Sequence, residues 1–278
     1  MDNRVDLHIH TNFSDGLLSP GQLLEAVRQK QLAAFAVTDH DTIKGYEAIR
    51  ELLADGDPKL VPGVELSVSY NRDDIHVLAY CFDPDHEVFN RALRDFQKNR
   101  NQRARRMVEK LNELGVQITF EQVEEGAVGT VIGRPHVAEA MARAKAVPSY
   151  ESAFAKYIGD GKPAYVPKPN FSPSEAIDLI HKAGGVAILA HPMIENRIRH
   201  LEMFVDLGLD GIEVYHSFHN RGDVDRLKHL ADRYRLLVSG GSDYHGREGR
   251  FGDIGSQKVP MECLDKIETR AQRRRESV

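Results

Sequence analysis

The chain has 278 residues, 41% of them hydrophobic and 28% charged, and a formal net charge of −5 at pH 7. These values are typical of an ordinary soluble globular protein, and the acidic balance argues against nucleic-acid binding by the whole surface. No apolar run approaches the ~20 residues that span a bilayer, and the first residues do not read as a signal peptide. Cys81 and Cys263 lie far apart, which favours a reducing compartment and argues against thiolate chemistry. We therefore expect a cytoplasmic protein with no membrane partner.

The first predicted strand carries the most informative pattern. Within residues 5–10, the period of two places Asp6, His8 and His10 on one face and apolar residues on the other. His8 and His10 could then share one divalent metal ion, and Asp15, just past the strand, could hold a second. A half-buried strand whose polar face happens to carry histidines is the structural alternative.

Helix starts and apolar runs alternate along the chain. Ser19-Pro20 and Ser172-Pro173 are typical helix starts, since a capping Ser precedes Pro at the first helical position. A short apolar run after each helix reads as a buried strand, and a strand, a helix and a strand make a parallel unit. A turn-rich tetrad joins two of the runs, which are expected to form a hairpin. About seven strands are predicted, at residues 5–10, 33–38, 60–70, 75–80 (the last two being the hairpin), 186–190, 211–215 and 236–239.

Polar residues gather where these predicted strands end. In a parallel barrel, the carboxyl ends of the strands form the rim at which catalytic residues lie. A single buried histidine at a strand end is usually structural, but so many such endings are hard to attribute to solvation alone. The residues at or just past the strand ends are His10, Asp39, His40, Glu65, His191, Asp243 and His245, and His76 lies near the start of the hairpin's second arm.

Residues 87–172 interrupt this alternation. Helical periodicity dominates the region, with a capped helix start at Thr119 and another start at Pro135. We interpret residues 87–172 as an inserted helical cap domain over the strand ends of a barrel domain formed by residues 1–86 and 173–278.

Two basic segments each have a structural and a functional interpretation. The run Lys98–Arg106 is interpreted as a solvated helix face, with contact to substrate phosphates as the alternative. The end of the chain, Arg270–Arg275, is interpreted as a frayed and solvated terminus, with RNA contact as the alternative.

The motifs at the strand ends occur together in a characteristic order. They are Asp6-Leu7-His8-Ile9-His10, Ser14-Asp15-Gly16, Thr38-Asp39-His40-Asp41, Gly63-Val64-Glu65, His76, His136, Ala190-His191-Pro192 and Gly241-Ser242-Asp243-Tyr244-His245. This set resembles the polymerase and histidinol phosphatase (PHP) family from about residue 4 to about residue 255. The resemblance implies an α/β fold, namely a distorted seven-stranded (β/α)7 TIM-like barrel with an inserted helical domain, and a cluster of two or three divalent metal ions.

The resemblance also implies which side chains hold the ions. Mixed histidine and carboxylate ligands suit Mn²⁺, Fe²⁺ or Zn²⁺ better than Mg²⁺ alone, and we expect Mn²⁺. Asp39 and Asp41 are expected to orient His40 and its neighbours rather than to bind metal. His8, His10, Glu65 and Asp243 would surround one ion, His76 and His136 would join the bridging Glu65 at a second, and Asp15, His40 and His245 would hold the third.

The implied activity is hydrolysis of a phosphate ester. Divalent ions polarise the phosphoryl group and lower the pKa of bound water to ~7, so that hydroxide can attack in line. Asp15 stands where several histidinol phosphate phosphatases have histidine, and residues 133–136 and 159–166 resemble the insertion of nucleoside 3',5'-bisphosphate phosphatases. We therefore predict a phosphoric monoester hydrolase that removes the 3'-phosphate of nucleoside 3',5'-bisphosphates, with 5'-to-3' trimming of short RNA as a further activity.

Candidate catalytic and substrate-binding residues complete the prediction. His191 is the candidate general acid or phosphate contact, with a structural role as the alternative, and Asp243 is assigned a catalytic role besides binding metal. Arg134 is the preferred phosphate ligand because a guanidinium matches two phosphate oxygens, and Lys162 and Tyr165 are further substrate contacts. The remaining histidines, assigned to surface or packing, are His86, His181, His200, His216, His219 and His229.

Two other functions remain open at this point. One is a histidinol phosphate phosphatase, against which Asp15 and the basic insertion argue. The other is a non-catalytic, metal-stabilised binding module, which would require ligands to be missing from the nine positions, and all nine are present. The expected partner is a small phosphorylated nucleotide, and no obligate protein partner is evident from the sequence.

Overall fold

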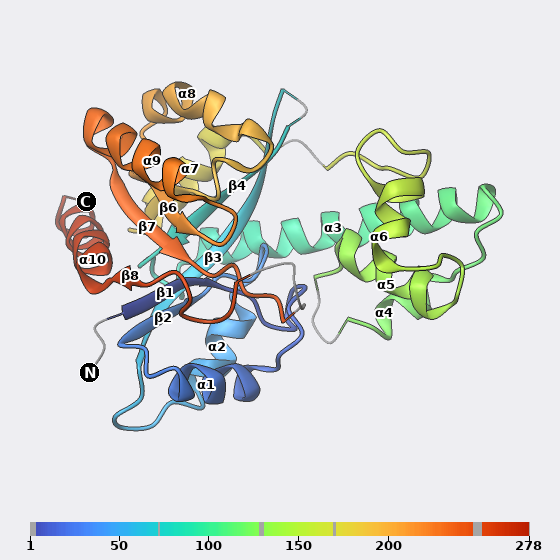
Figure 1. The fold of residues 1–278 in the computed structure, drawn as a ribbon, viewed down its shortest axis with the longest axis horizontal. Helices are drawn as coiled ribbons and strands as arrows, with labels where there is room; N and C mark the ends of the chain where they lie inside the picture. Colours follow the sequence, from blue (N-terminus) through green and yellow to red (C-terminus); the bar gives the residue numbers. More distant parts are fainter. Residues whose placement is uncertain (1–3, 72, 128–130, 169–170, 247–251, 278) are drawn as a thin grey trace.

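The computed structural model describes residues 4–71, 73–127, 131–168, 171–246 and 252–277. Its centre is one sheet, whose strands follow the order β7-β6-β5-β4-β3-β2-β1-β8 (Figure 1). The strands are β1 Arg4–Ile9, β2 Ala34–Val37, β3 Lys59–Tyr70, β4 Asp73–Tyr80, β5 Val186–Leu189, β6 Gly211–His216, β7 Leu237–Gly241 and β8 Val259–Pro260.

The sheet curls into a barrel. β1, β2 and β3 run parallel, as do β5, β6 and β7, whereas β4 is antiparallel to both β3 and β5. The turn after β7 meets β1, where the Asp243 amide donates to the His8 carbonyl over 2.8 Å and the His10 amide donates to the Tyr244 carbonyl over 3.0 Å. The predicted distorted TIM-like barrel and its hairpin are therefore confirmed. The strand count differs by β8, a two-residue strand antiparallel to β1.

The helices on the barrel begin where the capping signals predicted. Ser19 and Ser172 each form a capping box, and each precedes Pro at the first helical position. Their helices pack apolar faces on the sheet, which is apolar and buried along its strands. The barrel helices are α1 Pro20–Gln29, α2 Lys44–Arg50, α7 Pro173–Lys182, η2 Ile194–His200, α8 Leu201–Asp206, α9 Arg221–Tyr234 and α10 Met261–Glu276.

The C-terminal segment is a packed helix, so the interpretation of Arg270–Arg275 as a frayed end is wrong. Arg274 donates to Asp210 over 2.8 Å and also to the Gly185 carbonyl, and Arg275 donates to the Cys81 carbonyl over 2.7 Å. These contacts hold α10 against the end of the barrel opposite the histidine-rich rim. Arg274 and Arg275 therefore contribute to the packing of this helix.

A helical segment extends to one side of the barrel (Figure 1). Its long first helix, α3, contributes Phe89 to the barrel core and Leu111 to a second apolar core within the segment. The boundary proposed at residue 87 thus falls at the start of a helix shared by both cores. None of the helices described is long and apolar enough to cross a membrane. The segment comprises α3 Glu87–Glu113, α4 Phe120–Glu124, α5 Arg134–Arg143, α6 Tyr150–Ala153 and η1 Phe154–Ile158.

Candidate metal centre and active site

Two histidines and two carboxylates meet at the rim of the barrel. His8 and His10 project from β1 and its end, Glu65 from β3, and Asp243 from the turn after β7, and all are buried. Glu65 Oε2 lies 3.3 Å from Nε2 of His8 and 3.3 Å from Nε2 of His10. Asp243 Oδ1 lies 3.3 Å and 3.2 Å from the same two nitrogens. Their potential ligand atoms all lie within 4.8 Å of one another, close enough to share one metal ion.

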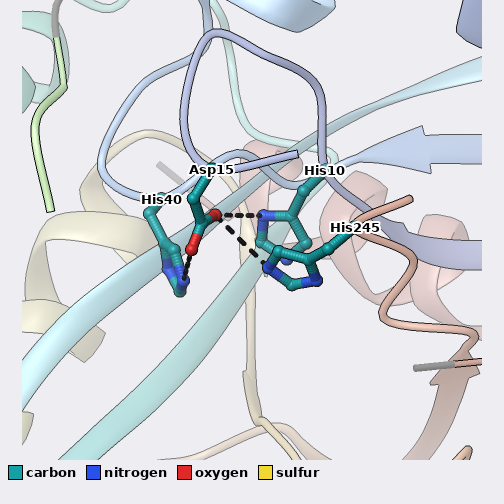
Figure 2. Close-up of side chains that lie close together, drawn as sticks. All are labelled: His10, Asp15, His40 and His245. Carbon is teal, nitrogen blue, oxygen red and sulfur yellow. Dashed lines mark ion pairs between the residues drawn. The ribbon is translucent and has the colours of Figure 1, made fainter. Parts of the chain in front are cut away.

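A second group shares His10 with the first. Figure 2 shows the Asp15 carboxylate pointing between the rings of His10, His40 and His245. Its Oδ1 lies 3.3 Å from Nε2 of His245 and 3.9 Å from Nδ1 of His10, and its Oδ2 lies 3.9 Å from Nε2 of His40. This group contains the three residues expected to hold the third ion.

Glu65 connects a third group to the first. Its Oε2 lies 3.2 Å from Nδ1 of His40, and its Oε1 lies 2.8 Å from Nδ1 of His76. One carboxylate therefore faces histidines of two groups, which is the arrangement a bridging ligand requires. We refer to the residues of these three groups as the ligand cluster: His8, His10, Asp15, His40, Glu65, His76, Asp243 and His245.

The ligand cluster fits divalent ions because several of its buried polar atoms form no hydrogen bond of normal geometry among the described residues, although oppositely charged atoms lie 2.8–3.3 Å from them. Buried polar atoms are normally paired, so each such atom needs a reason. Metal ligation by a lone pair is one, and mixed imidazole and carboxylate donors suit Mn²⁺, Fe²⁺ and Zn²⁺. The unpartnered atoms are His8 Nε2, His10 Nε2, His40 Nδ1, His76 Nδ1 and Asp15 Oδ1.

Protonation compensates the buried carboxylates when no cation is bound. Burial opposes the charge on His10, but Asp243 and Glu65 outweigh it and raise the pKa of His10 to about 10. Burial also opposes the charge on His8, but the neighbouring carboxylates, Glu213 above all, outweigh burial and raise the pKa of His8 well above its usual value. Burial also opposes ionisation of Glu65, yet the surrounding histidines lower the pKa of this carboxyl well below its usual range. The cluster is therefore built to hold positive charge, as protons or as metal ions.

Glu213 and His216 join this site, and sequence reasoning missed both as functional residues. Glu213 Oε1 accepts from Nδ1 of His8 over 2.9 Å, which leaves Nε2 of His8 as the free lone pair. Nε2 of His216 lies 3.2 Å from Asp243 Oδ2, so its assignment to surface or packing was incomplete. The signal for Glu213 was an acidic residue inside the apolar run of β6.

His136 stands apart from the ligand cluster. It is buried at the first turn of α5, where its Nδ1 accepts the Gly133 amide over 3.0 Å. Burial lowers its pKa, and Asp15 and the backbone of Ser14 oppose that shift. His136 is thus beside Asp15 but in none of the three groups described above, and its role as a metal ligand stays a prediction.

Both ring nitrogens of His191 have partners. Nε2 lies 2.9 Å from Glu65 Oε1, and Nδ1 lies 3.0 Å from Nη1 of Arg197. Because a guanidinium only donates and a carboxylate only accepts, Nδ1 carries the lone pair and Nε2 carries the proton. Burial lowers the pKa of His191 to about 4. The ring is therefore a neutral donor directed at Glu65, and its backbone has the unusual φ of 28°.

The hydrogen bonds described for Asp39 and Asp41 go to neighbours of the site and not to His40 itself, and neither residue belongs to the ligand cluster. Asp39 accepts from the Thr11 amide over 2.7 Å and from the Ser14 hydroxyl over 2.7 Å, which fixes the loop that carries Asp15. Asp41 accepts from the Ser67 amide over 2.8 Å and pairs with Arg100 of α3. Asp41 thereby ties the helical segment to the barrel.

A cavity of about 260 Å³ opens beside the ligand cluster. Asp15, Glu65 and His191 line one part of it, and basic side chains line the other. Arg100 and Arg103 face inward from α3, so the interpretation of Lys98–Arg106 as a solvated face is wrong for these two residues. We call the basic part the cationic wall: Arg100, Arg103, Arg134 and Lys168.

The three residues predicted to contact substrate lie at different distances from the main cavity. Arg134 lines the cavity, donates to Asp160 over 2.6 Å and lies 3.4 Å from Asp74. Tyr165 lines a neighbouring cavity, with its ring 5.8 Å from the Arg134 guanidinium. Lys162 is exposed and lies outside the lining of the main cavity.

Comparison with known proteins places this site in a family. Residues 6–156 match the model of the PHP domain. The chain is 32% identical to the 3',5'-nucleoside bisphosphate phosphatase of Chromobacterium violaceum, over 93% of each chain, and 32% identical to the 5'-3' exoribonuclease Rnm of Escherichia coli, over 86% and 84%. A crystal structure of a candidate metal-dependent phosphoesterase from Bifidobacterium adolescentis superposes with a TM-score of 0.87 at 33% identity, over 96% of each chain. The chain therefore belongs to the PHP family.

Proposed function

We propose that this protein is a metal-dependent phosphoesterase that hydrolyses phosphate monoesters at the rim of its barrel. The observation that carries the proposal is the set of unpartnered ligand atoms on His8, His10, His40 and His76, which lie beside a cavity with a cationic wall. Imidazoles and carboxylates of this kind hold divalent ions, and basic side chains hold phosphate oxygens.

The nine predicted ligands have defined places in this proposal. The ligand cluster would hold the ions, with Glu65 between two of them, and His136 would join from α5. When bound, divalent ions polarise phosphoryl oxygens and bring the pKa of a water ligand towards ~7. Mn²⁺ is the preferred ion, with Fe²⁺ or Zn²⁺ as the other candidates.

The chain's own side chains would position the phosphate and support the leaving group. His191 offers an N–H at Nε2, held in place by Arg197 at Nδ1. This single N–H is directed at Glu65, so we assign it as a hydrogen-bond donor to a phosphoryl oxygen or to the departing oxygen once Glu65 binds metal instead. Asp243 is the second carboxylate, besides Glu65, that faces the Nε2 atoms of His8 and His10.

The proposed substrate is a nucleoside 3',5'-bisphosphate, from which the enzyme removes the 3'-phosphate. The relative in Chromobacterium violaceum carries that activity in its name, and the relative in Escherichia coli is named as an exoribonuclease. Trimming of short RNA from the 5' end is therefore proposed as a second activity. Arg134 is the proposed phosphate ligand, with Tyr165 and Lys162 further out along residues 159–166.

A substrate panel tests the assignment. Metal-loaded protein would be assayed with adenosine 3',5'-bisphosphate, short 5'-phosphorylated RNA and histidinol phosphate, with metal content measured on the same sample. We expect the bisphosphate to be turned over with the highest kcat/KM. Faster turnover of histidinol phosphate would overturn the substrate assignment, and absence of any phosphate release with metal bound would favour a non-catalytic module.

A further inference from the structure

A β-bulge in β6 brings two polar side chains to the ligand cluster. The pairing of β6 with β7 advances by two residues on β6, from Glu213 to Tyr215, while it advances by one residue on β7. In a regular strand, Glu213 and His216 would point to opposite faces because they are three residues apart. The bulge changes this alternation, and both side chains come together with His8, their potential ligand atoms lying within 4.8 Å of one another.

The neighbouring strand is shaped to accept the bulge. A Cβ on Gly240 would lie 2.5 Å from Cβ of Tyr215 and 2.6 Å from its carbonyl oxygen, so only glycine fits opposite the bulge. Bulges often lie beside active sites, where they redirect a side chain. Here the redirected side chain is His216, which is fully buried.

The hydrogen bonds of His216 define which of its nitrogens carries the proton. Its Nδ1 accepts the Phe218 amide over 3.2 Å. Because an amide N–H only donates, Nδ1 holds the lone pair and Nε2 carries the proton. Nε2 therefore donates to Oδ2 of Asp243, which lies 3.2 Å away. A ring nitrogen that keeps its proton cannot ligate a metal, so His216 is a hydrogen-bond donor at this site and not a further ligand.

The two oxygens of Asp243 have different neighbours as a result. Oδ1 lies 3.3 Å from Nε2 of His8 and 3.2 Å from Nε2 of His10, whereas Oδ2 accepts from His216. The last torsion of an aspartate side chain is broad and roughly two-fold, so the carboxylate plane is not fixed by the chain itself. A donor on Oδ2 fixes that plane and leaves Oδ1 directed at the ligand cluster.

We infer that His216 is a positioning residue, which holds Asp243 by Oδ2 so that Oδ1 alone is presented to the ions. The inference rests on the metal site of the function proposed above and deepens it. His216 then supports metal binding without touching an ion. Without this donor, Oδ2 becomes a buried acceptor that has lost its partner, and the carboxylate is free to turn away from the ions.

Two replacements separate a hydrogen-bond donor from a packing ring. His216→Gln places an N–H donor near the position of Nε2 but has no ring, whereas His216→Phe keeps the ring without a donor. The measurement is calorimetric titration of metal-depleted protein with Mn²⁺. We expect the affinity of His216→Phe to fall roughly 10- to 100-fold and that of His216→Gln to stay within about three-fold of wild type. His229→Gln, at an exposed position on α9, is the control and should bind as wild type does.

A double substitution tests whether His216 acts through Asp243. In Asp243→Asn, the carboxylate that His216 orients is already gone, so adding His216→Phe should cause little further loss of Mn²⁺ affinity. If His216 contributed through packing alone, the two losses would be independent and their fold-changes would multiply.

Each result either supports or overturns the inference. Wild-type affinity in His216→Phe, equal losses in His216→Phe and His216→Gln, or fold-changes that multiply in the double variant would overturn it. If His216→Phe fails to fold, as judged by circular dichroism, imidazole NMR spectra of metal-depleted wild type decide. The His216 signals, identified by their loss in His216→Gln, should show the proton on Nε2, and a proton on Nδ1 would overturn the inference.

The proposed function is tested separately by phosphate release from the metal-loaded wild type. Absence of release together with the expected pattern of affinities would overturn the function and leave His216 in its positioning role. Wild-type protein that binds no Mn²⁺ would overturn both.

Discussion

Glu213 Oε1 lies 2.9 Å from Nδ1 of His8, and the second oxygen of the same carboxylate accepts the His191 amide over 2.7 Å. Glu213 and His8 are fully buried. One carboxylate thus fixes the orientation of a proposed metal ligand and the unusual backbone of the proposed phosphate contact. Such outer partners fix the orientation of the ring, place its ligating nitrogen toward the metal site and make it a stronger base.

Replacing this carboxylate by its amide should weaken metal binding. In Glu213→Gln, one acceptor oxygen becomes an NH₂ donor, so either Nδ1 of His8 or the His191 amide loses its acceptor. We expect metal affinity to fall about 10- to 100-fold, as for other outer-shell substitutions. Titration with Mn²⁺ followed by calorimetry measures the change. Glu109→Gln, an exposed site on α3, is the control, and equal affinity in both variants would contradict the role of Glu213.

Metal binding at neutral pH should displace protons from the ligand cluster. The pKa of His10 is raised to about 10 and that of His8 is raised well above its usual value, so both rings are protonated at pH 7 before metal binds. Imidazole must lose its proton to ligate a metal, and affinity should therefore fall as the pH falls. Calorimetry in buffers of different ionisation enthalpy should show release of about two protons. No buffer dependence would contradict this.

Substitution of Asp243 should stop turnover while the fold persists. Asn fits the site because it has the same size and tolerates the left-handed backbone at this position, where φ is 53°. Asp243→Asn removes the charge that faces His8 and His10, and we expect kcat to fall by at least about 100-fold. Phosphate release measures activity, and circular dichroism checks the fold. Activity within a few-fold of wild type would exclude the assigned role.

Asp210 lies at the end of the barrel opposite the site, and its replacement should lower the stability of the fold without affecting catalysis. It is buried, and it accepts from the Ala187 amide over 2.9 Å and from Arg274 over 2.8 Å. Asp210→Asn should lower the free energy of unfolding by about 2 kcal/mol, because the partly exposed arginine is left only partly compensated. Urea unfolding measures this loss, and exposed Asp206→Asn is the control.

That stability loss should depend on pH in one direction. Burial raises the pKa of Asp210, but hydrogen bonds from His181 and Arg274 outweigh burial and lower it well below its usual value. A carboxylate with a depressed pKa stabilises the fold above its unfolded pKa of about 3.9, and this contribution is lost as the pH falls through the folded pKa. The free energy of unfolding of wild type should exceed that of Asp210→Asn by the same amount at pH 7 and at pH 5. This excess should become smaller below about pH 4. A constant difference would contradict the assignment.

The sequence predicted the site residues at the strand ends better than those whose partners lie on distant elements. The histidines and carboxylates within or just after β1, β3 and β7 were visible as motifs because neighbours in sequence there are neighbours at the rim. Glu213 was not, since its partner His8 lies on a distant strand. Their closeness depends on barrel closure, which no local pattern encodes.

The basic run on α3 was misread for a related reason. Arg100 and Arg103 continue the spacing of Phe89, Leu93 and Phe96 along the inward face of the helix, whereas the other basic residues of the run face solvent. Charge density suggested a solvated surface, but helical phase separates the two kinds of arginine. The π-helix at Phe154–Ile158 and the packed C-terminal helix depend on tertiary contacts in the same way.

Anomalous X-ray scattering from crystals grown with Mn²⁺ tests the central claim most directly. The account predicts peaks among the facing atoms of His8, His10, Glu65 and Asp243, and a further peak beside Asp15, His40 and His245. Crystals that hold Mn²⁺ elsewhere on the chain, with no peak at these side chains, would contradict it.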